Sequence, residues 1–180
     1  MHNANQKAME AKATNANLMI RLLNGDDVAP IAKAFGRLNK PLNLYERYFQ
    51  EQVSKLRDVH IAFVEGKVAG YLTICWISTY PPFREQQIPE IVDFNVLPEL
   101  RRQGIGTALM DKAEHEIARV SKVAGIRVGM TPDYGAAQRM YVLRGYIPDG
   151  RGMHYRGHFI QYGEQMTVDD NMALYFTKDL

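Results

Sequence analysis

The sequence predicts one α/β domain in which helices flank a mixed central sheet. Three observations lead to this prediction: segments with strand and helix periodicity alternate, the chain has no internal repeat, and no linker interrupts residues 18–180. A length of 180 residues, of which 46% are hydrophobic and 23% charged, suits a single compact domain with its own core. The expected element order is β-α-α-β-β-β-α-β-α-β-β.

The N-terminal part is expected to form a tail, a strand and then helices. Residues 1–17 are rich in Ala, Asn and Lys and have few large apolar side chains, which predicts a flexible tail. The run "LMIRLL" predicts the first strand, and "NGDD" suits a helix start, where negative charge is favoured. A second helix, through about residue 57, is predicted by apolar residues at helical spacing, namely Tyr45, Phe49, Val53 and Leu56.

The middle of the chain is expected to form three strands. "HIAFVEGKVAGYLTICWIS" has two β-branched and aromatic runs around the turn signal "EGK", which predicts a hairpin. "TYPPFREQQIP" is expected to be a loop. "EIVDFNVLP" predicts a further strand that stops at Pro98, because proline lacks the amide hydrogen that a strand needs.

The C-terminal part is expected to alternate helices and strands. From Gly104, one apolar stripe predicts a helix, and its members are Ile105, Leu109, Ala113, Ile117 and Val120. "GIRVGM" predicts a strand, and "YGAAQRMYVLRG" predicts a helix that ends at Gly145. Two extended runs, "GMHYRGHFI" and "NMALYFTKDL", complete the chain.

Composition narrows the class of protein. A net charge of +2 and a pI of about 8.6 are too mild for a general nucleic-acid binder. The single cysteine, Cys75, excludes an internal disulfide and a cysteine-based zinc site, and it suits a reducing compartment. No apolar run approaches the ~18 residues that span a bilayer. We therefore expect a cytoplasmic protein without a membrane or nucleic-acid partner.

The stretch "VLPELRRQGIGTAL" indicates an anion site. A helix that begins at Gly104 or Gly106 leaves backbone N–H groups unpaired, and glycine lets a phosphate approach them. A P-loop would need Gly-Lys-Ser/Thr, and a dinucleotide fingerprint would need a small residue at Leu109 and a place in the first βα turn. A plain glycine helix cap with solvated arginines is the alternative interpretation.

This stretch resembles the coenzyme A signature of the GNAT acetyltransferase superfamily, Arg/Gln-x-x-Gly-x-Gly/Ala at a helix start. The matching run is Arg101, Arg102, Gln103, Gly104, Ile105 and Gly106, and the expected element order from Leu18 onward is similar to the GNAT fold. The resemblance implies acetyl-CoA as co-substrate, with its pyrophosphate on amides from Arg102 to Thr107. It also implies that Val96 and Leu97 bind the pantetheine arm through their backbone. No metal is implied.

Acetyl transfer from a thioester to an amine needs a neutral nucleophile, oxyanion stabilisation and a proton for the departing thiolate. Tyr141 in "YVLRGY" matches the family's Tyr-x-x-x-Gly-aromatic pattern, which implies that it is the acid. Its usual pKa of about 10 keeps it protonated. The alternative is a core tyrosine. A backbone amide near Val96 is expected to meet the oxyanion.

Two carboxylates in "EIVDF" are candidates for the general base. Glu90 matches the position of the glutamate in histone-type members of the family, and Asp93 is the rival. In a regular strand the two point to opposite faces, so at most one lines the substrate side. The alternatives are a solvated strand-end residue for Glu90, a buried hydrogen-bonded carboxylate for Asp93, and a bound water as base.

Several other residues have ordinary interpretations. Tyr134 stands where many relatives have asparagine, which weakens one coenzyme contact. Arg139 and Arg144 either reach the coenzyme phosphates or face water, and the second is expected. His154 and His158 are expected on one strand face, ~13 Å apart and too distant to share a metal. Cys75 is expected to be an inert buried thiol. Five aromatics form either a pocket or core: Tyr45, Tyr48, Phe49, Tyr80 and Phe83.

These observations predict an N-acetyltransferase that moves an acetyl group directly from acetyl-CoA to a primary amine in a ternary complex. The favoured acceptor is a small molecule, and the sequence leaves a homodimer open. The alternatives are a protein or peptide N-acetyltransferase, a non-catalytic acyl-CoA-binding module of the same fold, and a nucleotide-binding regulator.

Overall fold

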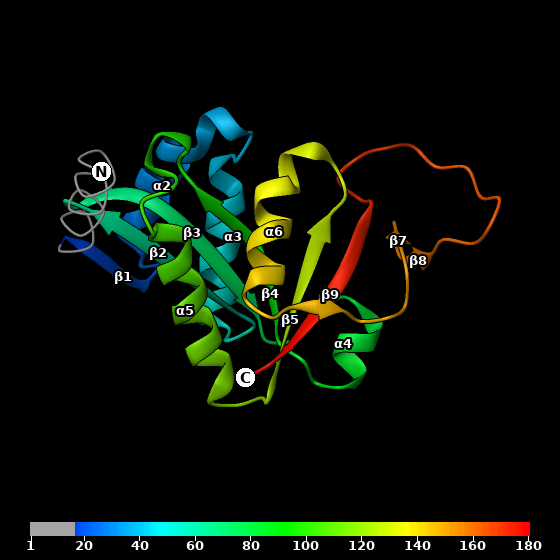
Figure 1. Ribbon diagram of the computed structural model, residues 1–180. Coiled ribbons are helices and arrows are strands. Elements are labelled where there is room, and N and C mark those ends of the chain that lie inside the picture. Colours follow the sequence, from blue (N-terminus) through cyan, green and yellow to red (C-terminus); the bar gives the residue numbers. More distant parts are fainter. Residues whose placement is uncertain (1–16) are drawn as a thin grey trace, which may run out of the picture. The chain divides into compact units, whose positions relative to one another are not determined.

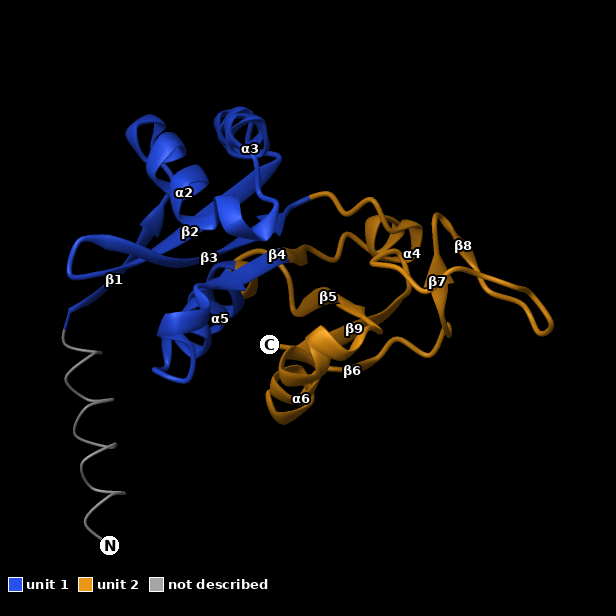
Figure 2. Ribbon diagram, turned by 90° about the horizontal axis from the view of Figure 1, so that it is seen from above, with its two compact units in different colours: residues 1–76, 93–116 blue, residues 77–92, 117–180 orange. Residues whose placement is uncertain are grey.

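The computed structural model describes residues 17–180 and shows an α/β fold with a mixed sheet and flanking helices, which confirms the predicted fold class. The predicted tail, residues 1–17, lies outside the described residues except for Asn17. The chain divides into two compact units (Figure 2). Unit 1 contains the residues up to Trp76 and Asp93–Glu116, and unit 2 contains Ile77–Val92 and Ile117–Leu180.

Unit 1 is built on an antiparallel meander. Its strands are β1 (Leu18–Leu22), β2 (Arg57–Val64) and β3 (Lys67–Cys75). Strand β2 pairs with both neighbours, and the β2–β3 turn at Glu65 and Gly66 has φ values of 50° and 74°. Two successive positive φ values suit the right-handed twist of a hairpin. The predicted hairpin around "EGK" is therefore confirmed.

Helices cover both faces of this meander. Figure 2 shows α2 (Val28–Phe35) and α3 (Leu42–Val53) on one face and α5 (Ile105–Ala118) on the other. The acidic start predicted at "NGDD" is a capping box of Asn24 and Asp27 that opens a short 3-10 helix, η1 (Gly25–Asp27). A second such turn, η2 (Gly36–Leu38), separates α2 from α3. The buried core beneath α2 and α3 includes Ile31, Phe35, Tyr45, Val59, Ile61 and Tyr71.

Unit 2 is built on β5 (Val123–Gly129) and β9 (Ala173–Asp179), which pair antiparallel along their whole length. Strand β5 also pairs in parallel with the start of β4 (Glu90–Val96), which makes the sheet mixed. Helices α4 (Pro81–Glu85) and α6 (Gly135–Leu143) lie on opposite faces of β5 and β9 in Figure 2. Strand β4 contributes Glu90–Val92 to unit 2 and Asp93–Val96 to unit 1.

The remaining elements are short. Two 3-10 turns, η3 (Pro98–Leu100) and η4 (Pro132–Tyr134), precede α5 and α6. Strand β6 (Ile147–Pro148) pairs with β9. Strands β7 (His154–Tyr155) and β8 (His158–Phe159) form a small hairpin, after which the chain makes a wide excursion before it returns as β9 (Figure 1).

Four predictions about local structure were wrong. "TYPPFREQQIP" is not all loop, because Pro81 at the first position starts α4. The helix predicted through about residue 57 ends at Val53, where the chain turns with φ 58° at Lys55. Helix α5 ends at Ala118, so Val120 is 70% exposed and leaves the buried stripe.

The fourth error concerns the two histidines. "GMHYRGHFI" is not one strand, because Arg156 and Gly157, with φ values of 46° and 95°, turn the chain back on itself. His154 faces Phe159 across the hairpin, and His158 faces Tyr155. The two histidines therefore lie on paired strands instead of on one face of a single strand.

Among the helices of residues 17–180, none combines the length and the apolar character that crossing a membrane requires.

Candidate functional site

The turn before α5 has the backbone that an anion site needs. It follows η3 and has left-handed φ values of 63° at Arg102 and 84° at Gly104. The hydrogen bond from Ala108 N to Gly104 O, at 3.0 Å, opens the helix. The amides of Ile105 to Thr107 therefore have no acceptor inside the helix. Together with the helix dipole, these N–H groups favour a bound anion.

Space is tight at two glycines near this turn. A Cβ at Gly106 would lie 3.1 Å from the ring of Phe94 on β4. A Cβ at Gly70 on β3 would lie 2.9 Å from Asn95 O and 3.2 Å from Leu109 Cδ1 of α5. The first turns of α5 thus press directly on β3 and β4. Within unit 1, this contact brings the glycine motif next to the strand that carries Val96.

Two backbone groups at the end of β4 already make hydrogen bonds within the protein. The amide of Leu97 donates to Ala69 O at 2.9 Å, so it is used in the sheet. The guanidinium of Arg101 folds back and donates from Nε to Val96 O at 3.1 Å. The predicted coenzyme residues from Val96 to Thr107 are therefore neighbours within unit 1, but the N–H of Leu97 is not free for a ligand.

Asp93 is the centre of a hydrogen-bond cluster in unit 1. Its Oδ1 accepts from Lys40 Nζ at 2.5 Å and from Asn95 Nδ2 at 2.9 Å. Its Oδ2 accepts from Tyr48 OH at 2.9 Å and from Tyr71 OH at 2.8 Å. A carboxylate offers about four lone-pair positions, and these four donors use them. Asp93 therefore matches the alternative of a hydrogen-bonded carboxylate, but its side chain is 13% exposed and so only partly buried. Its four hydrogen bonds leave no lone pair for a base.

The two tyrosines of this cluster remain donors. Burial, and next the charge of Asp93, raise the pKa of both Tyr48 and Tyr71 above its usual value. Their hydroxyl groups therefore keep their protons at neutral pH. Asp93 itself has φ 50°, so β4 is not a regular strand at this point, and the strict alternation assumed for "EIVDF" does not hold.

Glu90 lies in unit 2, where β4 pairs with β5. It is 3% exposed and accepts a hydrogen bond from Ser78 Oγ, which in turn accepts from Tyr80 N at 3.0 Å. The interpretation of Glu90 as a solvated strand-end residue is wrong. The carboxylate is instead buried and held by a serine.

Tyr141 also lies in unit 2, on α6, and is 5% exposed. Its ring packs edge-on against Tyr146 with centroids 6.1 Å apart. Burial raises the pKa of Tyr141 above its usual value, so the hydroxyl is neutral and can serve as an acid. The helix is anchored by Gln138 Nε2, which donates to Gly129 O at 2.8 Å.

Three residues that are near Tyr141 in the sequence differ in their packing and exposure. The ring of Tyr134 lies over Gly129, and a Cβ at position 129 would be 2.6 Å from that ring. The absence of a side chain at Gly129 therefore makes room for Tyr134. Arg139 is exposed, which confirms the prediction that it faces water. Arg144 is partly buried and makes contacts, so the same prediction stays untested for it.

Four of the five aromatic candidates pack in the two cores. Tyr45 and Tyr48 belong to the core of unit 1, and Tyr80 and Phe83 to that of unit 2, where Tyr80 stacks on Tyr175 with centroids 3.6 Å apart. Cys75 is half-buried and not fully buried as predicted, because it ends β3. In the part of the chain that the structure describes, no group of three or more His, Cys, Asp or Glu side chains is arranged to hold a metal.

Four functional candidates escaped the sequence analysis, namely Lys40, Tyr71, Ser78 and Asn95. Asn95 follows Asp93 by only two positions and donates to it, so it is the one candidate that lies close in sequence to its partner carboxylate within the cluster. Lys40 and Ser78 lie 53 and 12 residues from the carboxylates that they contact, so no local pattern points to them.

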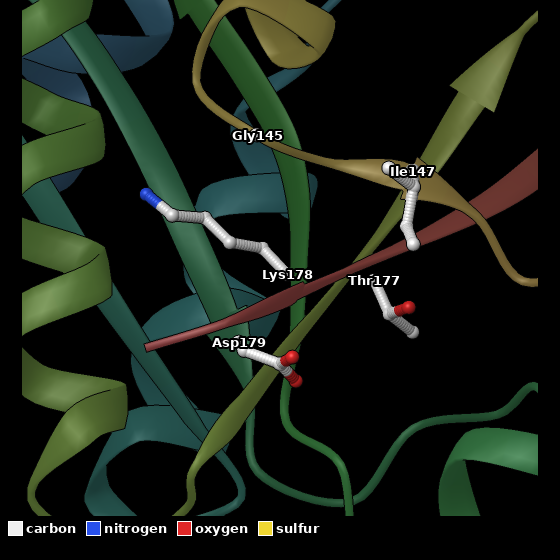
Figure 3. Close-up of a pocket in the computed structure, with 5 residues that line it drawn as sticks. All are labelled: Gly145, Ile147, Thr177, Lys178 and Asp179. Carbon is white, nitrogen blue, oxygen red and sulfur yellow. The ribbon is translucent and has the colours of Figure 1, made fainter.

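A hollow of about 200 Å³ in unit 2 is lined by Gly145, Ile147, Thr177, Lys178 and Asp179. Figure 3 shows that the side chain of Lys178 points away from those of Ile147 and Thr177. None of the predicted site residues lines this hollow.

Comparisons with known proteins agree with the glycine motif. The model of the acetyltransferase (GNAT) family matches residues 28–146. An uncharacterized N-acetyltransferase of Archaeoglobus fulgidus is 31% identical over 122 residues, which cover 62% of this chain and 82% of the relative.

Solved structures share the fold. An N-acetyltransferase from Staphylococcus aureus Mu50 has a TM-score of 0.67 at 16% identity, covering 91% of this chain and 98% of its own. A putative acetyltransferase from Salmonella typhimurium, described with its cofactor acetyl-CoA, has a TM-score of 0.64 at 16% identity, covering 91% and 94%. At such identities the likeness concerns the fold alone. Because the family model spans more than half of the chain, the prediction of an acetyl-CoA-dependent acetyltransferase is confirmed at the level of the family: the chain belongs to the GNAT family of acetyltransferases.

Proposed function

We propose that this protein transfers an acetyl group from acetyl-CoA to a primary amine of a small molecule, directly in a ternary complex. The observation that carries the proposal is the start of α5, where a left-handed Gly104 and a closely packed Gly106 leave backbone amides available to an anion. Acetyl-CoA carries a pyrophosphate that matches this site. The acetyl-CoA named for the Salmonella typhimurium structure supports the choice of ligand.

The residues of unit 1 fit the coenzyme. Amides from Arg102 to Thr107 would hold the pyrophosphate, and Arg102, which is exposed, would add a positive charge. Gly104 and Gly106 keep side chains out of the approach path. The backbone of Val96 would meet the pantetheine arm, whereas the amide of Leu97 stays on Ala69. Bound acetyl-CoA supplies the acetyl group as a thioester.

Tyr141 is the proposed acid. When the amine nitrogen bonds to the acetyl carbon and the carbon–sulfur bond breaks, the sulfur needs a proton. The Tyr141 hydroxyl retains its proton at neutral pH because burial raises its pKa. After it donates that proton, the buried site disfavours the phenolate, which promotes return of a proton from the amine side.

Glu90 is the proposed base, acting on the amine directly or through a water. Burial and the Ser78 hydroxyl hold its carboxylate in one orientation. Asp93 is the weaker candidate, because its four hydrogen bonds occupy its lone pairs. A small acceptor is favoured over a polycationic protein tail because a tail would be drawn to an acidic surface, and this chain carries a net charge of +2.

A thermal-shift assay with acetyl-CoA, ATP and NAD in parallel tests the ligand. At about 100 times its dissociation constant, a specific ligand adds ~2.7 kcal/mol, or about 5–10 °C for a domain of this size. We expect the shift with acetyl-CoA alone. A shift with ATP or NAD and none with acetyl-CoA would reject the proposal. Transfer to an amine is then followed by mass spectrometry of the product, with Tyr141→Phe as the impaired variant.

A further inference from the structure

The cluster around Asp93 in unit 1, called here the Asp93 site, is formed by Asp93, Lys40, Tyr48, Tyr71 and Asn95. Its three neutral donors stand on regular elements: Tyr48 on α3, Tyr71 on β3 and Asn95 on β4. Their hydrogen bonds to the carboxylate measure 2.8–2.9 Å. The carboxylate is therefore fixed in place by the core, whatever its fourth partner is.

The fourth partner differs in kind. Lys40 lies in the irregular segment between η2 and α3, directly after Asn39, which has a left-handed φ of 55°. Its side chain is 27% exposed, against 13% for Asp93, so it is the more solvent-accessible member of the pair. It contacts one carboxylate oxygen, at 2.5 Å.

A structural ion pair in the same unit has a different form. Arg21 binds Asp27 with two parallel contacts, of 2.5 and 2.8 Å, to both carboxylate oxygens. Such a fork loses little freedom per bond, whereas a lysine must order a flexible four-carbon chain to make one contact. The single contact of Lys40 with Asp93 is therefore easier to break than the two parallel contacts of Arg21 with Asp27.

We propose that the Asp93 site recognises an ammonium group of the acceptor, and that Lys40 occupies this position until the acceptor displaces it. This inference rests on the proposed function. The site offers what a compact ammonium needs, namely a partly buried carboxylate oxygen whose other lone pairs are already filled by neutral donors. Tyr48 and Tyr71 hold the carboxylate without competing for positive charge.

The chemistry of the site defines the class of acceptor. An amine held on a carboxylate is protonated and has no lone pair, so it is not the amine that is acetylated. The acceptor must therefore carry a second amino group that reacts. Asp93 precedes Val96 by three positions on β4, so the ammonium site and the backbone proposed to meet the coenzyme are separate. This separation favours a flexible α,ω-diamine over a simple alkylamine.

The experiment compares α,ω-diaminoalkanes of increasing chain length with n-alkylamines of the same lengths. Steady-state kinetics with acetyl-CoA give KM for each amine, and calorimetry without acetyl-CoA gives the affinity for the diamines independently of turnover. The proteins are the wild type, Lys40→Met, Asp93→Asn and Lys33→Met. Lys33 is the matched control, because it is an exposed lysine on α2 of the same unit.

With Lys40→Met we expect diamines to bind several-fold more tightly and their KM to fall, because the internal competitor is gone. With Asp93→Asn we expect diamine KM to rise ~10–100-fold more than monoamine KM, the cost of losing a charged hydrogen bond that only the diamine makes. Lys33→Met should match the wild type in both assays.

Unchanged diamine affinity in Lys40→Met, together with a lower melting temperature, would mean that Lys40 is only a structural tie and would overturn the inference. Equal losses for diamines and monoamines in Asp93→Asn would do the same. Failure of the proposed function has another signature, since a protein that binds no acetyl-CoA and acetylates no amine could still bind diamines in the calorimeter.

Discussion

The hydroxyl of Ser78 donates a hydrogen bond to the carboxylate of Glu90, and both side chains are buried in unit 2 at 1% and 3% exposure. Ser78 also accepts from the amide of Tyr80, so its own hydroxyl hydrogen is directed at Glu90. A buried carboxylate that is held in this way keeps its orientation while a proton arrives or leaves.

Replacing Ser78 by Ala is expected to cost about 1–3 kcal/mol of stability, because it leaves the buried carboxylate short of a donor. If Glu90 is the base, the acid limb of the pH–rate profile should also move to higher pH, since its charged form loses support. Urea unfolding and a pH series of kcat/KM measure the two effects. Thr79→Ala, the exposed neighbour, is the control. A stability loss with an unmoved profile would leave Ser78 a purely structural role.

Replacing Tyr141 by Phe is expected to lower kcat by about 10²–10⁴-fold, the usual contribution of a general acid, with acetyl-CoA affinity nearly unchanged. Because burial raises the pKa of Tyr141, the wild-type enzyme should keep this proton up to at least the usual tyrosine value of about 10. The check is kcat against pH beside calorimetric acetyl-CoA binding. Tyr162→Phe, a fully exposed tyrosine, should behave as the wild type. Full activity in Tyr141→Phe would assign the acid to another group.

Replacing Gly104 by Ala is expected to destabilise the fold by about 1–2 kcal/mol and to weaken acetyl-CoA binding. The reason is its φ of 84°, which a Cβ opposes. Gly135→Ala at the start of α6 is the matched control, because φ is –54° there and a Cβ would meet nothing within 4 Å. That control should gain about 0.4–1 kcal/mol. Thermal melts with and without acetyl-CoA separate strain from binding. Undiminished acetyl-CoA binding in Gly104→Ala would contradict the proposed anion site at the start of α5.

Replacing His60 by Leu is expected to stabilise the protein by about 1–3 kcal/mol. His60, on β2, is 2% exposed, and neither ring nitrogen has a hydrogen-bond partner among the described residues. Burial lowers the pKa of His60, against the nearby charge of Asp58. Unfolding at several pH values, with the wild type alongside, measures the change. No gain would mean that a polar partner satisfies the ring.

The same residue predicts a pH dependence with a definite sign. Below its ordinary pKa of about 6.5, the unfolded chain binds a proton that the folded protein resists. The free energy of unfolding is therefore unaffected by His60 protonation above about pH 6.5, and it decreases as the pH falls below that value. His154, whose pKa is also lowered by burial, acts in the same direction. His60→Leu should lose less stability than the wild type between neutral and mildly acidic pH, and identical slopes would contradict this assignment.

Much of the fold was predictable because local patterns and local forces agree. The turn "EGK", the acidic "NGDD" and the glycine start of α5 each became the expected element, since turn geometry, capping and helix periodicity act over a few residues. The predictions of secondary structure were wrong where one or two residues with positive φ end or reverse an element that the hydrophobic pattern would continue. Lys55 ends α3 early, and Arg156 with Gly157 folds an apparent strand into a hairpin.

The sequence by itself determined the family, because the run from Arg101 to Gly106 encodes a backbone shape, and a short motif suffices for that. Only the tertiary structure decided what surrounds the two carboxylates of β4. Glu90 accepts a hydrogen bond from a serine 12 residues away in the sequence, and Asp93 accepts one from a lysine 53 residues away. Such partners meet only when the chain has folded, because hydrogen bonding depends on separation in space and sequence patterns record only separation along the chain.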